Sequence, residues 1–290
     1  GKLKTFMLLM DQESTKYSLA STLENEIIAS CQIEGEILNR QSVRSSIKQK
    51  LGLESHEYYN AIRKEDNYVE ILIDANTHYN EALNLEKIFG WHHAMFEKGY
   101  SGFSKIKVAQ FRGDGSMQVV SGDYGNEKIH YEAPPFDTLE QEMNSFIQWF
   151  NETPSSLEKA AITHLWFVII HPFDDGNGRI ARAISDMILA QTESNGQRFY
   201  SVSSEINKEK SAYYDVLERT QHGEGDLTEW LAWYLKCIDN AVIDSYTMLS
   251  GVLRKSIFWR THSQVPISAR ERNVLNTYLD GYDAKLTIKN

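Results

Sequence analysis

Residues 171–182 read His-Pro-Phe-Asp-Asp-Gly-Asn-Gly-Arg-Ile-Ala-Arg, and this stretch constrains the fold more than any other. A residue before proline is pushed out of the helical region, so the apolar helix through 165–170 is predicted to end at or near His171. The glycines at 176 and 178 predict a tight turn, and a new helix is predicted to follow directly. The sequence therefore places a histidine and two aspartates in a turn between two helices.

The residue types in this turn suit a polyphosphate. Backbone N–H groups that converge at the start of a helix form an anion site, and Arg179 and Arg182 lie on one face of the new helix. An adjacent aspartate can hold the accompanying Mg²⁺, and a neutral His171 suits a general base near pH 7. Taken singly, each residue also fits a helix cap, a solvated turn or a surface ion pair, but together they favour a nucleotide site.

Composition limits the class of protein. With 290 residues, of which 41% are hydrophobic, the chain suits one large domain or two packed units. A net charge of -10 argues against a surface that coats nucleic acid. Two cysteines, Cys31 and Cys237, fit a reducing cytosol, and the longest apolar run, 165–170, is too short to cross a membrane. We therefore expect a cytoplasmic protein with no membrane partner.

Most of the N-terminal third has the spacing of amphipathic helices. Helices are predicted over 18–34 and 42–53, the second with Gly52 as its stop. Two or three helical segments are predicted within 67–96, with Gly90 near a junction.

The composition changes at residues 104–135, which are rich in Gly, Val, Ser and Asp. Gly-Asp-Gly at 113–115 lies between 107–112 and 116–121, and this pattern predicts a β-hairpin.

Helices are predicted again after residue 136. Pro154 precedes Ser155 and Glu158, whose spacing predicts a capping box. Further helices are predicted over 177–191, 207–221 and 227–249. The last segment, 270–290, looks like a small unit cut short.

The stretch 171–182 matches the HPFx(D/E)GNGRxxR signature of Fic-domain proteins at every defining position, so the chain resembles that family. Segments elsewhere look like the bacterial Fic subclass with an N-terminal inhibitory helix, including "SCQIEGE", "GWHHAMF", "MQVVSG", "HYEAPP", "RFYSVSSEI" and "YYDVLERTQ". The resemblance implies an all-α Fic fold with a small β-hairpin flap. We expect a helical region over 1–90 that carries the inhibitory helix, a catalytic core over 91–245 with the flap at about 104–135, and a C-terminal helical tail over 246–290.

The resemblance implies protein AMPylation, in which AMP moves from ATP to a Ser, Thr or Tyr hydroxyl of a target protein or of the chain itself. His171 would deprotonate the hydroxyl, and Asp175 would hold Mg²⁺. Asp174 occupies a variable position of the signature and receives no role. This division agrees with the physics of phosphoryl chemistry, which needs positioning and charge neutralisation more than covalent help.

The same resemblance implies the nucleotide contacts. Gly176, Asn177 and Gly178 would cradle phosphate oxygens, Arg179 would meet the β-phosphate and Arg182 the γ-phosphate. Three further residues are expected to contact the nucleotide, namely Tyr213, Tyr214 and Gln221, the last in place of the asparagine of many relatives. The expected target-docking flap comprises Met117, Gln118, Val119, Val120, Ser121 and Gly122.

Ser30 and Glu34 fit the S/T-x-x-x-E-G pattern that marks the inhibitory helix in this family. By resemblance, Glu34 would bind Arg182 and so remove the partner of the γ-phosphate. In some relatives the same glutamate orients a water that removes AMP from a modified protein, so a deAMPylase is an alternative.

A DNA-binding regulator with a vestigial Fic site is the other alternative, because 270–287 resembles the start of a winged-helix unit. DNA is expected as a partner only through such a C-terminal unit, which is not complete here. The target protein stays open, and a homodimer is compatible with the sequence.

Overall fold

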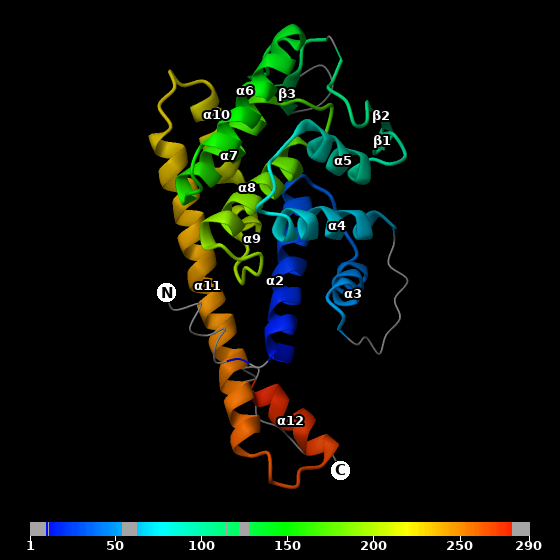
Figure 1. The fold of residues 1–290 in the computed structure, drawn as a ribbon, viewed down its shortest axis with the longest axis vertical. Helices are drawn as coiled ribbons and strands as arrows, with labels where there is room; N and C mark the ends of the chain where they lie inside the picture. The colour runs from blue at the N-terminus through cyan, green and yellow to red at the C-terminus, as the bar shows by residue number, and fades with distance from the viewer. Residues whose placement is uncertain (1–9, 11, 54–62, 114, 122–127, 280–290) are drawn as a thin grey trace.

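The computed structural model describes residues 10, 12–53, 63–113, 115–121 and 128–279. Helices dominate this part of the chain (Figure 1). Their bounds are α2 (Gln12–Ile33), α3 (Arg40–Lys50), α4 (Arg63–Thr77), α5 (Leu85–Met95), α6 (Leu139–Glu152), α7 (Leu157–Ile170), α8 (Asn177–Glu193), α9 (Val202–Lys208), α10 (Lys210–Gln221), α11 (Thr228–Thr261) and α12 (Ala269–Leu279). The prediction of a mostly helical fold with a small β-hairpin is confirmed.

Two short antiparallel strand pairs complete the fold. β1 (Tyr100–Ser101) pairs with β2 (Ser104–Lys105), and β3 (Gln118–Ser121) pairs with β4 (Lys128–Glu132). The predicted strand over 107–112 is wrong, because no strand forms there. Its backbone N–H groups are used elsewhere: Lys107 donates to Asp174, and Arg112 donates to the carbonyl of Pro172. The segment is thus fixed to the turn at 171–176 instead of to a β-ladder.

Two local predictions also need correction. Gly90 lies inside α5, and the junction before that helix is 78–84, where the side chain of Asn84 caps it. The N-terminal cap of α7 is Ser156, whose side chain accepts a hydrogen bond from the N–H of Lys159, and not Ser155. The capping-box spacing therefore placed the start of this helix one residue too early.

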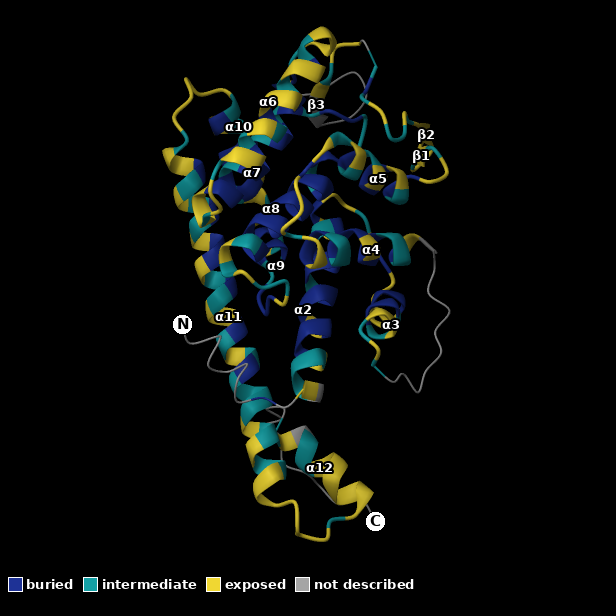
Figure 2. Ribbon diagram, in the orientation of Figure 1, coloured by how far each residue is buried: buried dark blue, intermediate teal, exposed yellow. Residues whose placement is uncertain are grey.

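Helix α8 lies at the centre of the molecule and fixes the position of the turn before it. It packs against α2, α4, α5 and α7, and every residue from Arg179 to Ala190 is buried. Figure 2 shows this helix in the buried colour, whereas α12 is mostly exposed. Because the core holds α8 on several sides, its N-terminal turn is a rigid platform for chemistry.

The lower half of α11 extends beyond the body of the molecule and carries α12 against it (Figure 1). Within the described residues, no helix combines the length and apolar character needed to span a bilayer.

Candidate active site

His171 lies at the C-terminal end of α7, where the chain adopts a left-handed conformation (φ 50°, ψ 57°). Its Nδ1 is 3.2 Å from the carbonyl oxygen of Val168. A carbonyl can only accept a hydrogen bond, so Nδ1 carries the proton. Nε2 is then unprotonated, and it forms no hydrogen bond with the residues that the structure describes. Burial lowers the pKa of His171, which keeps the ring neutral near pH 7. The predicted general base therefore has the correct tautomer for that role.

Arg112 holds this histidine from its backbone side, a contact that the sequence did not indicate. Its Nε donates to the carbonyl of His171 at 2.9 Å, and its Nη2 donates to the carbonyl of Pro134 at 2.5 Å. Its backbone N–H donates to the carbonyl of Pro172 at 2.9 Å. The side chain is buried, with 1% exposed. Arg112 thus ties the end of α7 to the segment that follows β4.

Asp175 presents a carboxylate beside the start of α8. It accepts hydrogen bonds from the hydroxyl of Ser101, from the N–H of Gly176 and from Arg179, the last at 3.0 Å. Burial opposes ionisation, but Arg179 and these hydrogen bonds outweigh it, so the pKa of Asp175 is lowered. Asp174 instead accepts the N–H of Lys107 at 2.8 Å and holds the adjacent loop.

His92 supports the same turn from α5. Its Nδ1 accepts the N–H of Ala109 at 3.1 Å, so its Nε2 is protonated and donates to the carbonyl of Asp175 at 3.2 Å. Its ring stacks on Phe173 with a centroid distance of 4.1 Å. Burial lowers the pKa of His92 to about 4, so it stays neutral. The sequence predicted a helical segment here, and "GWHHAMF" belongs to the resemblance, but neither indicated this role of His92.

The surroundings of Asp175 fit a Mg²⁺ that arrives with a nucleotide. The described residues form no cluster of three or more protein ligands for a metal. Mg²⁺ at phosphate sites commonly takes one or two carboxylates and completes its shell with water and phosphate oxygens. Asp175 supplies one ionised carboxylate to a pocket of about 420 Å³ whose lining also includes Arg179 and Ser101.

The N-terminus of α8 offers backbone N–H groups that have no partner within the helix. Gly176 precedes it with φ 88°, a conformation that favours glycine. The side chain of Asn177 does not face the site, because it bonds both the N–H and the carbonyl of Phe173. A Cβ on Gly178 would lie 2.2 Å from Oε1 of Glu34. The carboxylate of Glu34 therefore lies directly over the first turn of α8, where an anion would bind.

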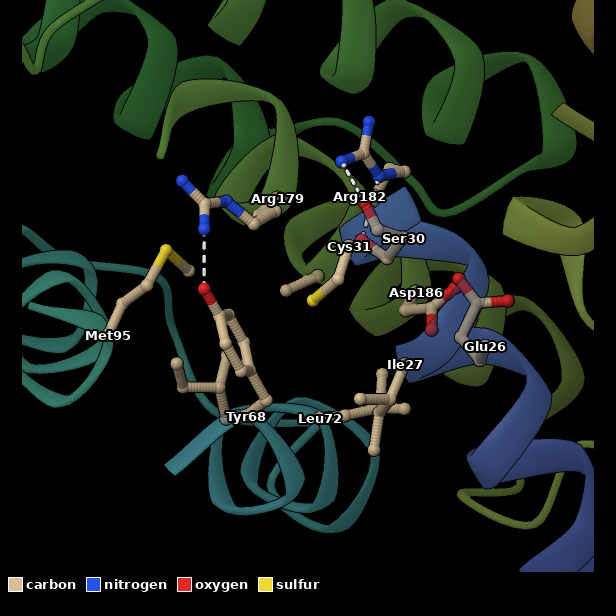
Figure 3. Close-up of a pocket in the computed structure, with 12 residues that line it drawn as sticks. Glu26, Ile27, Ser30, Cys31, Tyr68, Leu72, Met95, Arg179, Arg182 and Asp186 are labelled. Carbon is tan, nitrogen blue, oxygen red and sulfur yellow. Dashed lines mark hydrogen bonds between the residues drawn. The ribbon is translucent and has the colours of Figure 1, made fainter. Parts of the chain in front are cut away.

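Arg182 is held by the end of α2, as the resemblance implied. Its Nη2 donates to Oε1 of Glu34 at 2.7 Å and to the carbonyl of Ser30 at 2.9 Å, and its Nε donates to the hydroxyl of Ser30 at 2.8 Å. Burial disfavours the cation, but Glu34 outweighs this and raises the pKa of Arg182. Figure 3 shows Ser30 of α2 beside Arg182 of α8.

Arg179 contacts two residues that the sequence did not indicate. Its Nη1 donates to Oε2 of Glu36 at 2.5 Å and bonds the hydroxyl of Tyr68. Figure 3 shows Tyr68 pointing from α4 toward Arg179. No spacing rule links Tyr68 or Glu36 to the signature, because they contact it only through the tertiary fold.

The three expected nucleotide contacts on α10 differ in how far they are buried. Tyr213 is a core residue with 2% exposed, and its hydroxyl lies 2.9 Å from Nε2 of His164. Its contact with a nucleotide stays a prediction. Tyr214 is 41% exposed and donates to the carbonyl of Ile33 at 2.9 Å. Gln221 ends α10 and is partly buried.

The predicted flap corresponds to β3 and the residues beside it. Gln118, Val119, Val120 and Ser121 form β3. Met117 precedes the strand, and its carbonyl accepts the N–H of Ala133 at 2.9 Å. Gly122 lies outside the described residues.

Parts of the chain match known protein families. The profile of the Fic/DOC family matches residues 82–189, and that of a domain of unknown function (DUF4172) matches residues 1–53. The chain is similar to "Protein adenylyltransferase Fic" of Nematostella vectensis, with 24% identity over 84% of this chain and 53% of the relative. The protein of that name from Aedes aegypti is 25% identical over 76% of this chain and 41% of the relative. The chain therefore spans about half the length of these curated relatives or less.

Solved structures show the same fold. A Fic family protein from Desulfovibrio desulfuricans G20 aligns over 80% of this chain and 66% of its own, with 22% identity and a TM-score of 0.61. A Fic domain containing signaling protein from Bacteroides thetaiotaomicron aligns over 88% of this chain and 94% of its own, with 19% identity and a TM-score of 0.60.

Proposed function

We propose, from the premise that this chain carries a domain of the Fic family, that it transfers AMP from ATP to a hydroxyl group of a protein. The observation that carries the proposal is the position of His171, a neutral imidazole with an unprotonated Nε2, beside the N-terminus of α8. A base next to an anion site brings a hydroxyl and a phosphate together. The names of the relatives support the same activity.

In the proposed reaction, Nε2 of His171 takes the proton of the attacking hydroxyl. Its oxygen forms a bond to the α-phosphorus, and the bond from that phosphorus to the bridging oxygen breaks, so pyrophosphate leaves with the electron pair. Arg179, Arg182 and the backbone N–H groups of α8 stabilise the developing negative charge. A Mg²⁺ bound through Asp175 would neutralise phosphate charge at the site.

We further propose that Glu34 restrains this activity. It pairs with Arg182 at 2.7 Å and lies over Gly178, so it covers both the cation and the helix terminus that the outer phosphates would use. A negative carboxylate in that position opposes the binding of a tetra-anionic nucleotide.

The position of the Glu34 carboxylate also favours one second function, removal of AMP from a modified protein. A carboxylate that lies over the anion site can orient a water for attack on the phosphorus of a bound AMP group. Transfer and removal would then use the same pocket, with Glu34 opposing the first and promoting the second.

Label position separates these functions. Wild type and Glu34→Gly are incubated with ATP that carries its label on the α- or the γ-phosphate. The proposal predicts protein-bound label only from the α-position, with more in the variant. Label from the γ-position would indicate phosphoryl transfer and refute it. Release of AMP from a modified protein by wild type, lost in Glu34→Gly, would show that removal also occurs.

A further inference from the structure

The turn after α2 presents a second acidic residue, Glu36, to the other arginine of α8. The chain doubles back at Gly35, where φ is 77°. Arg179 and Arg182 are three residues apart and share one helix face. One turn therefore places a carboxylate on each arginine, with Glu34 2.7 Å from Arg182 and Glu36 2.5 Å from Arg179.

Glu36 is held on both of its oxygens. The hydroxyl of Tyr68 donates to Oε2 at 2.6 Å, and Nζ of Lys64 forms an ion pair with Oε1. The side chains of Arg179 and Glu36 are only 7% and 15% exposed. A charge-assisted hydrogen bond that is sheltered and braced in this way is stronger than a solvated surface pair. The contact is thus built into the fold.

The guanidinium group of Arg179 is already engaged by protein side chains, including Tyr68 of α4. Its Nη1 is shared between Glu36 and Tyr68, and its Nη2 bonds Asp175. Its Nε is buried and has no hydrogen-bond partner within the described part of the chain. Glu36, Asp175 and Arg179 all line the pocket of about 420 Å³. An anion that binds Arg179 in this pocket therefore competes with Glu36 for the guanidinium group. The negative charge of the Glu36 carboxylate also repels it.

We propose that Glu36 is a second inhibitory carboxylate, positioned by Tyr68 and Lys64, which competes with the β-phosphate for Arg179. This proposal rests on the proposed function and on the expectation from the family resemblance that Arg179 meets the β-phosphate and Arg182 the γ-phosphate. ADP retains the β-phosphate and AMP lacks it. Glu36 therefore weakens the binding of ADP and ATP and leaves the binding of AMP unchanged, whereas a structural role would not distinguish these nucleotides.

Calorimetric titration with ATP, ADP and AMP in the presence of Mg²⁺ tests this. Each variant also carries His171→Ala, so that no transfer occurs during the measurement. Adding Glu36→Gln to Glu34→Gly is expected to tighten ADP binding by roughly tenfold, the scale of one sheltered charge-assisted contact, with AMP unchanged. Tyr68→Phe removes the hydroxyl that holds Glu36 and is expected to act in the same direction with a smaller effect.

Glu70→Gln is the matched control, because Glu70 lies on α4 and pairs at 2.8 Å with Lys50 at an exposed position outside this pocket. It is expected to leave all three affinities unchanged. Circular dichroism melting confirms that each variant is folded, and Tyr68→Phe alone decides the matter if Glu36→Gln does not fold.

The outcomes separate the two proposals. If Glu34→Gly binds ATP, but neither Glu36→Gln nor Tyr68→Phe tightens ADP binding, the role of Glu36 is refuted while the proposed function stands. An equal gain for AMP would also refute it. If no variant binds any of the nucleotides, both proposals fail.

Discussion

Replacing Arg112 with methionine is expected to destabilise the protein and to slow the proposed AMP transfer. Arg112→Met keeps most of the aliphatic side chain but removes the donors to the carbonyls of His171 and Pro134, at 2.9 and 2.5 Å. A hydrogen bond from a charged group contributes about 1.5–3 kcal/mol. Burial lowers the pKa of Arg112, and this cost of burying the cation offsets part of the sum. We therefore expect a loss of about 3 kcal/mol.

For a chain of this size, each kcal/mol lowers the melting temperature by about 2–4 °C, so the fall is roughly 6–12 °C. Urea unfolding followed by the fluorescence of the six tryptophans measures the same loss. Transfer is expected to fall by at least tenfold with little change in nucleotide affinity, because Arg112 contacts the loop of the base and not the arginines of α8.

The matched control is Arg219→Met. Arg219 pairs with Glu229 on the surface, with side chains 57% and 58% exposed, and its replacement is expected to leave the unfolding midpoint and the transfer rate unchanged. If Arg112→Met unfolds at the same urea concentration as wild type and transfers AMP at the same rate, the inference that Arg112 fixes His171 is refuted.

Three further predictions concern the site itself. Glu34→Gly is expected to raise auto-modification with labelled ATP by tenfold or more. Arg182 is still held by Ser30 in this variant, but the negative charge over the first turn of α8 is lost. No gain would mean that Glu34 does not restrain the site. Asp175→Ala is expected to lose transfer and Mg²⁺-dependent nucleotide binding together. Asp174→Ala removes the hydrogen bond that Asp174 accepts from the N–H of Lys107, and it is expected to keep most activity. Equal losses would mean that the metal ligand is misassigned. Burial lowers the pKa of His171. The acid limb of the kcat/KM profile of Glu34→Gly is therefore expected below pH 6.5, the ordinary pKa of histidine. An acid limb above pH 6.5 would contradict a buried neutral base.

Local features of the site were predictable from the sequence. Proline after His171 ends α7, and glycine before Asn177 permits the turn into α8, because both effects depend on adjacent residues. The pairing of Glu34 with Arg182 joins residues far apart in the chain, and only the resemblance to Fic-domain proteins pointed to it.

The supporting contacts could not be predicted in this way. Arg112 and His92 reach the signature across long stretches of chain and carry no spacing that distinguishes them from ordinary polar residues. The Gly-Asp-Gly pattern misplaced the hairpin turn, because the segment before it donates its N–H groups to the loop at 171–176. Tyr213 has the residue type of a ring-stacking contact, but the helix direction turns it into the core.

The most direct test of the central claim compares Glu34→Gly with Glu34→Gly/His171→Ala after incubation with ATP and Mg²⁺. Intact-mass spectrometry detects the modification, and calorimetric titration of the same samples gives the affinity for ATP. The account predicts that the first variant gains the mass of AMP and the second gains none, while both bind ATP with similar affinity, because the base acts on the hydroxyl and the arginines hold the phosphates. A mass gain of AMP in both variants, or in neither, would contradict it.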